Sequence, residues 1–373
     1  MEMTPKERLL ATAEFEPLDR PFMWETLGFW NETLDRWHGE GLPSEIDEII
    51  SANLYFGVDP QLPVIIGDSD QPGFFPLFDE EVVEQTDEYV IKRDPAGSLV
   101  KVLASGASTI PAWLESPVKD RESWEEVKAR LDPETPGRME NHLMLAGFSG
   151  GADWPLWVYA TGLFGTLRML LGFTPLVLAY RRQPELVHEM SRHWADFWKS
   201  ITSQIAATRV PDAIYLWEDM CYKNGPMIGP GAFDEFMSPY YKEVVGFLRN
   251  ELGVPVVNVD TDGDCLLLLP KFVEAGVNMI LPWEVQAGMD VVAVRERWPR
   301  EFVINGGIDK RALYADRKAI KDEVLRVVPP MLAKGGYIPA LDHLVPPEVP
   351  LDNYRYFLEL VREVGVKACA GAA

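Results

Sequence analysis

Residues Val254–Glu284 read VPVVNVDTDGDCLLLLPKFVEAGVNMILPWE, and this stretch indicates the fold class. The apolar run Val254–Val259 predicts a buried strand, and acidic side chains follow it directly. A helix is expected over Cys265–Glu274, ended by Gly276, and a second short strand over Met279–Leu281. Strand–helix–strand units of this kind are typical of parallel α/β folds, in which the chemistry lies at the C-terminal ends of the strands.

The same alternation of strands and helices recurs through the chain. Eight strands are expected, near Phe22, Ile65, Val158, Ile214, Val257, Ile280, Val303 and Ile338. Eight strand–helix units predict a closed (β/α)8 TIM barrel. Residues 89–103 alternate apolar and polar side chains around the turn at 94–97, which predicts a β-hairpin insertion after the second strand. We therefore expect a single barrel domain over 1–373, with the insertion at about 71–150.

Composition narrows the class of protein. Apolar residues make up 47% of the chain and charged residues 25%, as in globular proteins. The net charge of −23 argues against nucleic acid and anionic membranes as partners. No apolar run is long enough to span a bilayer, and the N-terminus does not resemble a signal peptide. Three widely spaced cysteines, Cys221, Cys265 and Cys369, favour a reducing, cytoplasmic location.

Acidic side chains follow nearly every predicted strand. The residues at these strand ends are Glu25, Asp68, Glu218, Asp219, Asp260, Asp262, Glu284, Asp309, Asp342 and His343. Any one of them could be a helix cap or a turn residue, but a barrel would bring them to one rim. Crowded carboxylates raise one another's pKa or bind a cation. The set therefore predicts either a general acid or a metal site.

Two features of this set favour particular chemistry. Asp260 and Asp262 alternate on an extended chain, so both carboxylates could reach one ion. His343 is the histidine expected at a strand end, and beside Asp342 it could be an acid/base or a metal ligand. Gly306-Gly307 also follows a strand, but no dinucleotide or Walker motif accompanies it, so no nucleotide site is predicted.

Several segments together resemble one known superfamily. They are Trp217–Met220 with Lys223–Pro226, Asp260–Gly263, Glu274–Asn278, Gly306–Arg311, Gly335–Pro339 and Asp342–Pro347. On these segments the chain resembles the uroporphyrinogen decarboxylase superfamily, in the branch beside the cobalamin-dependent methyltransferases. The resemblance covers essentially the whole chain. It implies a (β/α)8 barrel, in agreement with the strand count, and a homodimer as one candidate oligomeric state.

The decarboxylases of that superfamily act on a tetrapyrrole polycarboxylate without a cofactor. They hold the substrate carboxylates with arginines after the first strand, where residues 24–30 of this chain read WETLGFW. Asp68 and His343 fall near positions that the decarboxylases use. The missing arginines nevertheless argue against decarboxylation of such a substrate.

The methyltransferases of the superfamily move a methyl group between a substrate and a corrinoid. Their coenzyme M branch binds zinc through a His-x-Cys pair and a further Cys at the last strand. This chain has Asp260 and Asp262 at the first of these positions and Asp342-His343 at the second. Because the cysteine ligands of that branch are absent from these positions, thiol activation by zinc is not expected. Oxygen ligands with one imidazole remain compatible with zinc or another divalent ion.

The resemblance thus predicts a cytoplasmic, corrinoid-dependent methyltransferase acting on a small methylated substrate, such as a methoxylated aromatic. The corrinoid would be carried by a separate protein. Asp260, Asp262 and His343 would bind the divalent metal or take its place. The acid/base residues would be Glu218, Asp219, Glu284 and His343, and the substrate-binding residues Trp24, Asp68, Trp217, Trp283 and Asp342. A metal-free decarboxylase or lyase and a non-enzymatic accessory subunit are the alternatives.

Overall fold

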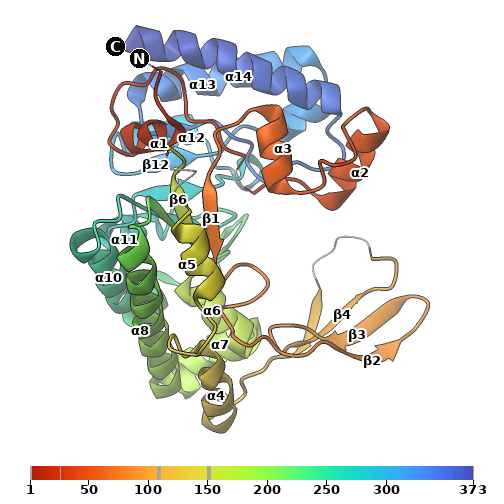
Figure 1. The fold of residues 1–373 in the computed structure, drawn as a ribbon, viewed down its shortest axis with the longest axis vertical. Helices are drawn as coiled ribbons and strands as arrows, with labels where there is room; N and C mark the ends of the chain where they lie inside the picture. The colour runs from red at the N-terminus through yellow and green to blue at the C-terminus, as the bar shows by residue number, and fades with distance from the viewer. Residues whose placement is uncertain (1, 26, 107–110, 149–152, 373) are drawn as a thin grey trace.

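A parallel sheet forms the centre of the molecule (Figure 1). The computed structural model describes residues 2–25, 27–106, 111–148 and 153–372. The strands of the sheet, in spatial order, are β1 Leu62–Ile65, β6 Leu156–Thr161, β7 Ala213–Trp217, β10 Val256–Asp260, β11 Met279–Leu281, β12 Val303–Asn305 and β13 Tyr337–Ile338. All neighbours pair in parallel. Seven predicted strands are thereby confirmed, in a TIM-barrel-like α/β fold.

The predicted first strand, at residues 21–24, is not a regular strand. Its side chains still alternate, since Phe22 and Trp24 join one buried cluster and Met23 joins the other. The backbone N–H of Asp59 donates to the Met23 carbonyl oxygen at 2.8 Å, and the Met23 N–H donates to Asp59 Oδ2 at 2.8 Å. One of these two bonds goes to a side chain, so the segment is extended without forming a strand ladder.

Two hydrophobic clusters follow the two faces of the sheet. The cluster on the inner strand faces, here called the interior cluster, contains Leu9, Phe22, Trp24, Trp157, Ala213, Tyr215, Val256, Met279, Leu281, Val303 and Ile338. The outer strand faces pack with the helices in a larger cluster, the helix-facing core. This division follows from the two-residue period of strands, which sends alternate side chains to opposite faces. The interior is therefore filled by side chains, as in other small barrels.

Helices surround the sheet. They are α1 Pro5–Ala13, α2 Asn31–Gly39, α3 Ile49–Phe56, α4 Arg121–Lys128, α5 Glu140–Ala146, α6 Leu163–Leu171, α7 Phe173–Arg182, α8 Pro184–Thr208, α9 Pro230–Phe236, α10 Ser238–Gly246, α11 Leu269–Glu274, α12 Val291–Arg297, α13 Arg317–Lys334 and α14 Leu351–Ala372. The helix expected from Cys265 begins only at Leu269. Pro270 follows in the first turn, where a missing N–H costs nothing, so the helix starts there.

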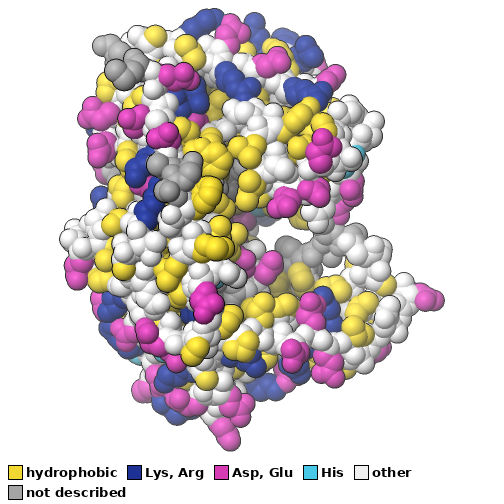
Figure 2. Space-filling view, viewed as in Figure 1, with side chains coloured by type: hydrophobic (Ala, Val, Ile, Leu, Met, Phe, Trp, Pro, Cys, Tyr) yellow, Lys and Arg dark blue, Asp and Glu magenta, His cyan; other side chains and the backbone are white. Residues whose placement is uncertain are grey.

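A four-stranded antiparallel sheet is inserted between β1 and β6 along the chain, although these two strands pair with each other. It projects from the rest of the molecule (Figure 1). Its strands are β2 Glu81–Gln85, β3 Tyr89–Arg93, β4 Leu99–Leu103 and β5 Ala112–Glu115. The predicted hairpin is β3 with β4, and β2 and β5 widen it. Figure 2 shows the surface hollowed between this sheet and the body of the protein. Of the predicted insertion, 107–110 and 149–150 lie outside the described residues.

Within the described ranges, no single helix is long and apolar enough to cross a membrane. Helices α6 and α7 reach that length and apolar composition only when they are counted together, and the chain bends by 102° between them.

Candidate functional site

Three neighbouring strands end at the candidate site. Asp260 is the last residue of β10 and lies opposite Trp217 on β7 and Leu281 on β11. The backbone N–H groups of Glu218 and Asp219 both donate to the Asp260 carbonyl oxygen, at 2.9 and 3.1 Å. These bonds lock the ends of β7 and β10 together, so the acidic residues that follow each strand are held side by side.

Asp262 and His343 form the polar pair at this rim. Asp262 Oδ2 lies 3.4 Å from His343 Nε2, and the two side chains are 29% and 22% exposed. Burial alone would lower the pKa of His343, but the hydrogen bond and charge of Asp262 outweigh it, and the pKa is raised. Glu284 adds to this charge while its Oε2 accepts from the Gly263 N–H at 2.9 Å. The pair is thus an acid/base group that solvent can reach.

Asp260 lies beneath this pair and is buried. Its Oδ2 accepts a hydrogen bond from the Tyr215 hydroxyl, whose ring belongs to the interior cluster. Burial, and then the charge of Asp262, raises the pKa of Asp260 well above its usual range. A carboxyl group in this setting favours its neutral form, which can donate a hydrogen bond.

Asp219 has an unusual backbone conformation at the end of β7. Its φ is +40°, in a region that side-chain-bearing residues seldom adopt. Arg168 donates to the Asp219 carbonyl oxygen at 2.9 Å and to its Oδ2 at 2.8 Å, and lies 5.0 Å from the Trp217 ring. Burial raises the pKa of Asp219 despite this arginine. Strain of this kind persists where the surroundings enforce it, often at functional sites.

Glu218 belongs to the helix layer. Its buried carboxylate accepts from the Gly165 N–H at 2.8 Å, at the N-terminus of α6, and from the Tyr241 hydroxyl on α10. Burial raises the pKa of Glu218 to about 7, although those donors oppose the shift. These contacts hold the carboxylate against α6 and α10, and none of them is to the Asp262–His343 pair. Its predicted acid/base role remains a prediction.

Gly162 makes room for Glu218 at the start of α6. A Cβ at this position would lie 2.3 Å from Glu218 Cδ. We expect Gly162→Ala to lower the free energy of unfolding by about 2–4 kcal/mol, because the buried carboxylate cannot withdraw. Urea denaturation measures the loss. Gly229→Ala is the matched control, since Gly229 also precedes a helix and a Cβ there meets no atom within 4 Å. Equal losses in both variants would contradict this interpretation.

Asp342 and Asp68 are bonded mainly to backbone. Asp342 is fully buried and accepts from the N–H groups of Val285 and Lys310, both at 3.0 Å, and from Lys310 Nζ at 3.3 Å. These bonds tie together the loops after β11 and β12. Asp68 accepts from the N–H groups of Asp70 and Gln71, a turn arrangement. Neither contact set involves the pair of Asp262 and His343, so the substrate-binding roles remain predictions.

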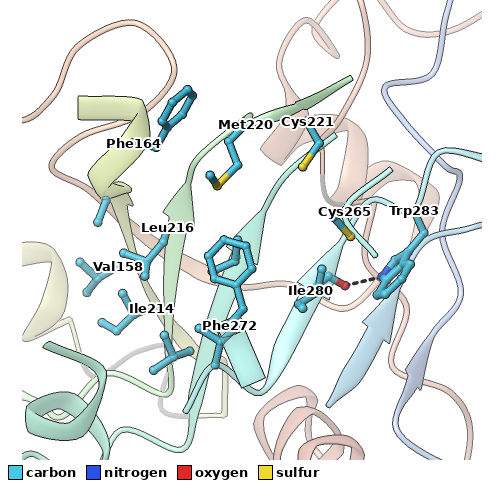
Figure 3. Packing of buried hydrophobic residues seen from close by; sticks show 14 of the residues in the cluster. Val158, Phe164, Ile214, Leu216, Met220, Cys221, Cys265, Phe272, Ile280 and Trp283 are labelled. Carbon is cyan, nitrogen blue, oxygen red and sulfur yellow. Dashed lines mark hydrogen bonds between the residues drawn. The ribbon is translucent and has the colours of Figure 1, made fainter. Parts of the chain in front are cut away.

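The three tryptophans predicted to line one pocket lie in different places. Trp24 packs against Trp157 in the interior cluster, with ring centroids 4.4 Å apart. Trp217 lies at the end of β7, partly buried against that cluster. Trp283 belongs to the helix-facing core, where its Nε1 donates to the Ile280 carbonyl oxygen at 2.7 Å (Figure 3). The structure therefore does not bring the three indoles together.

Aromatic side chains that the sequence prediction missed line the interior instead. Tyr159 and Tyr215 have ring centroids 4.9 Å apart. Ile65 lies opposite Tyr159 in the register and is 49% exposed, although this face of β1 turns inward. The rim of the interior is thus open to solvent beside Ile65, at the end of β1. The signal in the sequence was the alternation of Ala213, Tyr215 and Trp217, which places two rings on one strand face.

The predicted metal ligands do not converge in the described part of the chain. There, no three His, Cys, Asp or Glu side chains are grouped so that they could hold a metal ion. Asp260 is turned toward Tyr215, whereas Asp262 pairs with His343. As arranged, these described residues do not fit a divalent metal. Metal binding at this rim remains a prediction from the resemblance.

The segments on which the resemblance was based, between Trp217 and Pro347, all lie within a match to a known protein family. Residues 105–364 match the family model described as Uroporphyrinogen decarboxylase (URO-D). The chain belongs to the uroporphyrinogen decarboxylase family. Similar proteins include the uroporphyrinogen decarboxylases of Chlorobium phaeobacteroides, 26% identical over 239 residues, and of Alcanivorax borkumensis, 27% identical over 239 residues. Each match covers 62% of this chain, and the chain spans 63% and 62% of the length of these two relatives.

A solved structure supports the same fold. The methyltransferase from Methanosarcina mazei superposes with a TM-score of 0.66 at 16% identity, covering 97% of this chain and 99% of that one. At that identity the likeness shows the fold alone. The chain thus belongs to a family whose named relatives are decarboxylases, and it shares its fold with that methyltransferase.

Proposed function

We propose that this family member is a methyltransferase that takes a methyl group from a small methylated compound, such as a methoxylated aromatic. The observation that carries the proposal is the Asp262–His343 pair, which is partly exposed and lies above the Asp260–Tyr215 bond. Trp217, beside Asp260 in the register, supplies an aromatic surface at the same rim. This arrangement combines a proton donor with a surface that binds a flat ring.

The chemistry follows from the leaving group. When a methyl group is transferred from an aryl ether, the C–O bond breaks and its electron pair remains on the oxygen. His343, whose pKa is raised by Asp262, would in its protonated form give its proton to this oxygen. The neutral carboxyl group of Asp260 would donate a hydrogen bond to the same developing charge. A corrinoid carried by a separate protein would supply the methyl acceptor.

A decarboxylase is the second candidate, since the similar proteins named above are uroporphyrinogen decarboxylases. The described rim fits a polycarboxylate poorly. Arg168 and Lys310 supply positive charge there, and both already bond to carboxylates, those of Asp219 and Asp342. An incoming polycarboxylate would also meet Asp262 and Glu284 at the same rim, and like charges repel one another.

The test is a methyl-transfer assay with the purified chain. Reduced corrinoid protein and a panel of methoxylated aromatics are added, and the absorbance of methylcobalamin is followed. We expect methylcobalamin to form with at least one member of the panel. Carbon dioxide release from carboxylated substrates is measured in parallel. Release of carbon dioxide without any corrinoid spectral change would favour the decarboxylase.

A further inference from the structure

Asn258 lies inside the barrel without a hydrogen-bond partner. It is in the middle of β10, it is 0% exposed, and neither of its side-chain amide atoms is bonded. Its neighbours in the register are Tyr215 on β7 and Met279 on β11, and both belong to the interior cluster. The amide therefore faces the barrel interior, two residues below Asp260. Unpaired buried amides destabilise a fold, so each one calls for an explanation.

The polar groups around Asn258 do not satisfy it. The Tyr215 hydroxyl donates to Asp260, and Gln61 Nε2 donates to the Tyr159 hydroxyl at 2.7 Å. The indole nitrogens of Trp24 and Trp157, on residues of the same interior cluster, are also buried without a partner. The interior thus holds free hydrogen-bond donors, together with an amide that offers both a donor and an acceptor.

We propose that Asn258 is a ligand-binding residue at the floor of the candidate site and that it receives the hydroxyl group of a phenol-type aromatic ring. A hydroxyl both donates and accepts, which matches the two free atoms of the amide. The tilted rings of Tyr159 and Tyr215 provide an aromatic wall at the same level. This inference rests on the proposed function, because it names the substrate class for the same site.

A neutral ligand group fits this position better than an anion. Tyr215 and Met279, the neighbours of Asn258 in the register, carry no positive charge, so a carboxylate beside the amide would gain no cation from them. Solvent reaches the rim on the side of β1, where Ile65 faces inward and is 49% exposed. Tyr159, next to Ile65 in the register, is only partly buried. Side chains between Ile65 and Asn258 must shift for a ligand to reach the amide.

Binding of two probes to the full chain tests the inference without any corrinoid. Phenol and toluene have nearly the same shape and differ in the hydroxyl group. We expect the wild-type chain to bind phenol about tenfold more tightly than toluene, as one satisfied hydrogen bond allows. Asn258→Leu should abolish this preference. Met279→Leu, a volume-conserving change at the neighbouring position, should retain it. Isothermal titration calorimetry measures all six affinities.

A stability measurement accompanies the binding experiment. Because Asn258→Leu removes an unpaired buried amide, its thermal midpoint should stay equal to that of the wild type or rise by roughly 2 °C. A midpoint several degrees lower than that of Met279→Leu would show that the amide is satisfied within the fold, and would overturn the inference. Equal binding of phenol and toluene by the wild type would also overturn it. Absence of methyl transfer with the phenol preference intact would contradict only the proposed function.

Discussion

Replacing Asp262 by asparagine is expected to lower the turnover number by roughly 10²–10⁴-fold at neutral pH, the usual contribution of a general acid. The physical reason is that two opposing effects, burial and the charge of Asp262, set the pKa of His343. Burial favours the neutral imidazole, and the Asp262 carboxylate reverses this preference. Without that charge the pKa of His343 falls, and the imidazole is neutral when the leaving oxygen needs a proton. The turnover number, measured against pH, reports the change.

The pH profile separates this role from a structural one. In the wild type, turnover should fall as pH rises through the raised pKa of His343, because the protonated form is the active one. In Asp262→Asn the same fall should occur at lower pH. Asp264→Asn is the matched control, since Asp264 lies in the same loop and its carboxylate accepts from the Leu266 N–H at 3.0 Å. Wild-type turnover and an unshifted profile in Asp262→Asn would contradict the assignment.

The second large effect concerns Glu25, a buried carboxyl group beside the barrel. Burial raises its pKa from 4.5 to about 8, although the Tyr354 hydroxyl donates to it at 3.2 Å and opposes the shift. The folded chain therefore binds a proton that the unfolded chain releases. Between pH 4.5 and pH 8 the free energy of unfolding should fall with rising pH, by roughly 4 kcal/mol in total.

Glu25→Gln should remove this pH dependence, because the amide does not ionise. Urea denaturation of the wild type and of the variant at pH 5, 6.5 and 8 measures it. The variant should gain stability relative to the wild type as pH rises. Glu16→Gln, at an exposed position, controls for the general effect of losing one negative charge. If the free energy of unfolding changed with pH in the same way for the wild type and Glu25→Gln, burial would not raise the pKa of Glu25.

Local sequence patterns were sufficient to predict the sheet and the segment that bears Asp260 and Asp262. The apolar runs of β7, β10 and β11 need only their own residues to predict buried parallel strands, and the carboxylates that follow them must then lie at one edge. The β3–β4 hairpin likewise follows from alternation around a turn. The extended segment at Phe22 was predicted as a strand because it is a short apolar run, yet its pairing depends on Asp59, far along the chain.

Only long-range packing decided which acidic residues meet. Asp219, Asp260 and Asp262 share the rim, whereas Glu218 turns to the N-terminus of α6 and Asp342 turns to backbone N–H groups of two loops. In the sequence all five are simply carboxylates after strands. Their directions depend on strand register, on loop backbone such as the positive φ of Asp219, and on helices contributed by distant segments. The parallel strand direction therefore predicts which end of the barrel holds the candidate site, and the assembled tertiary contacts decide which of its acidic residues meet.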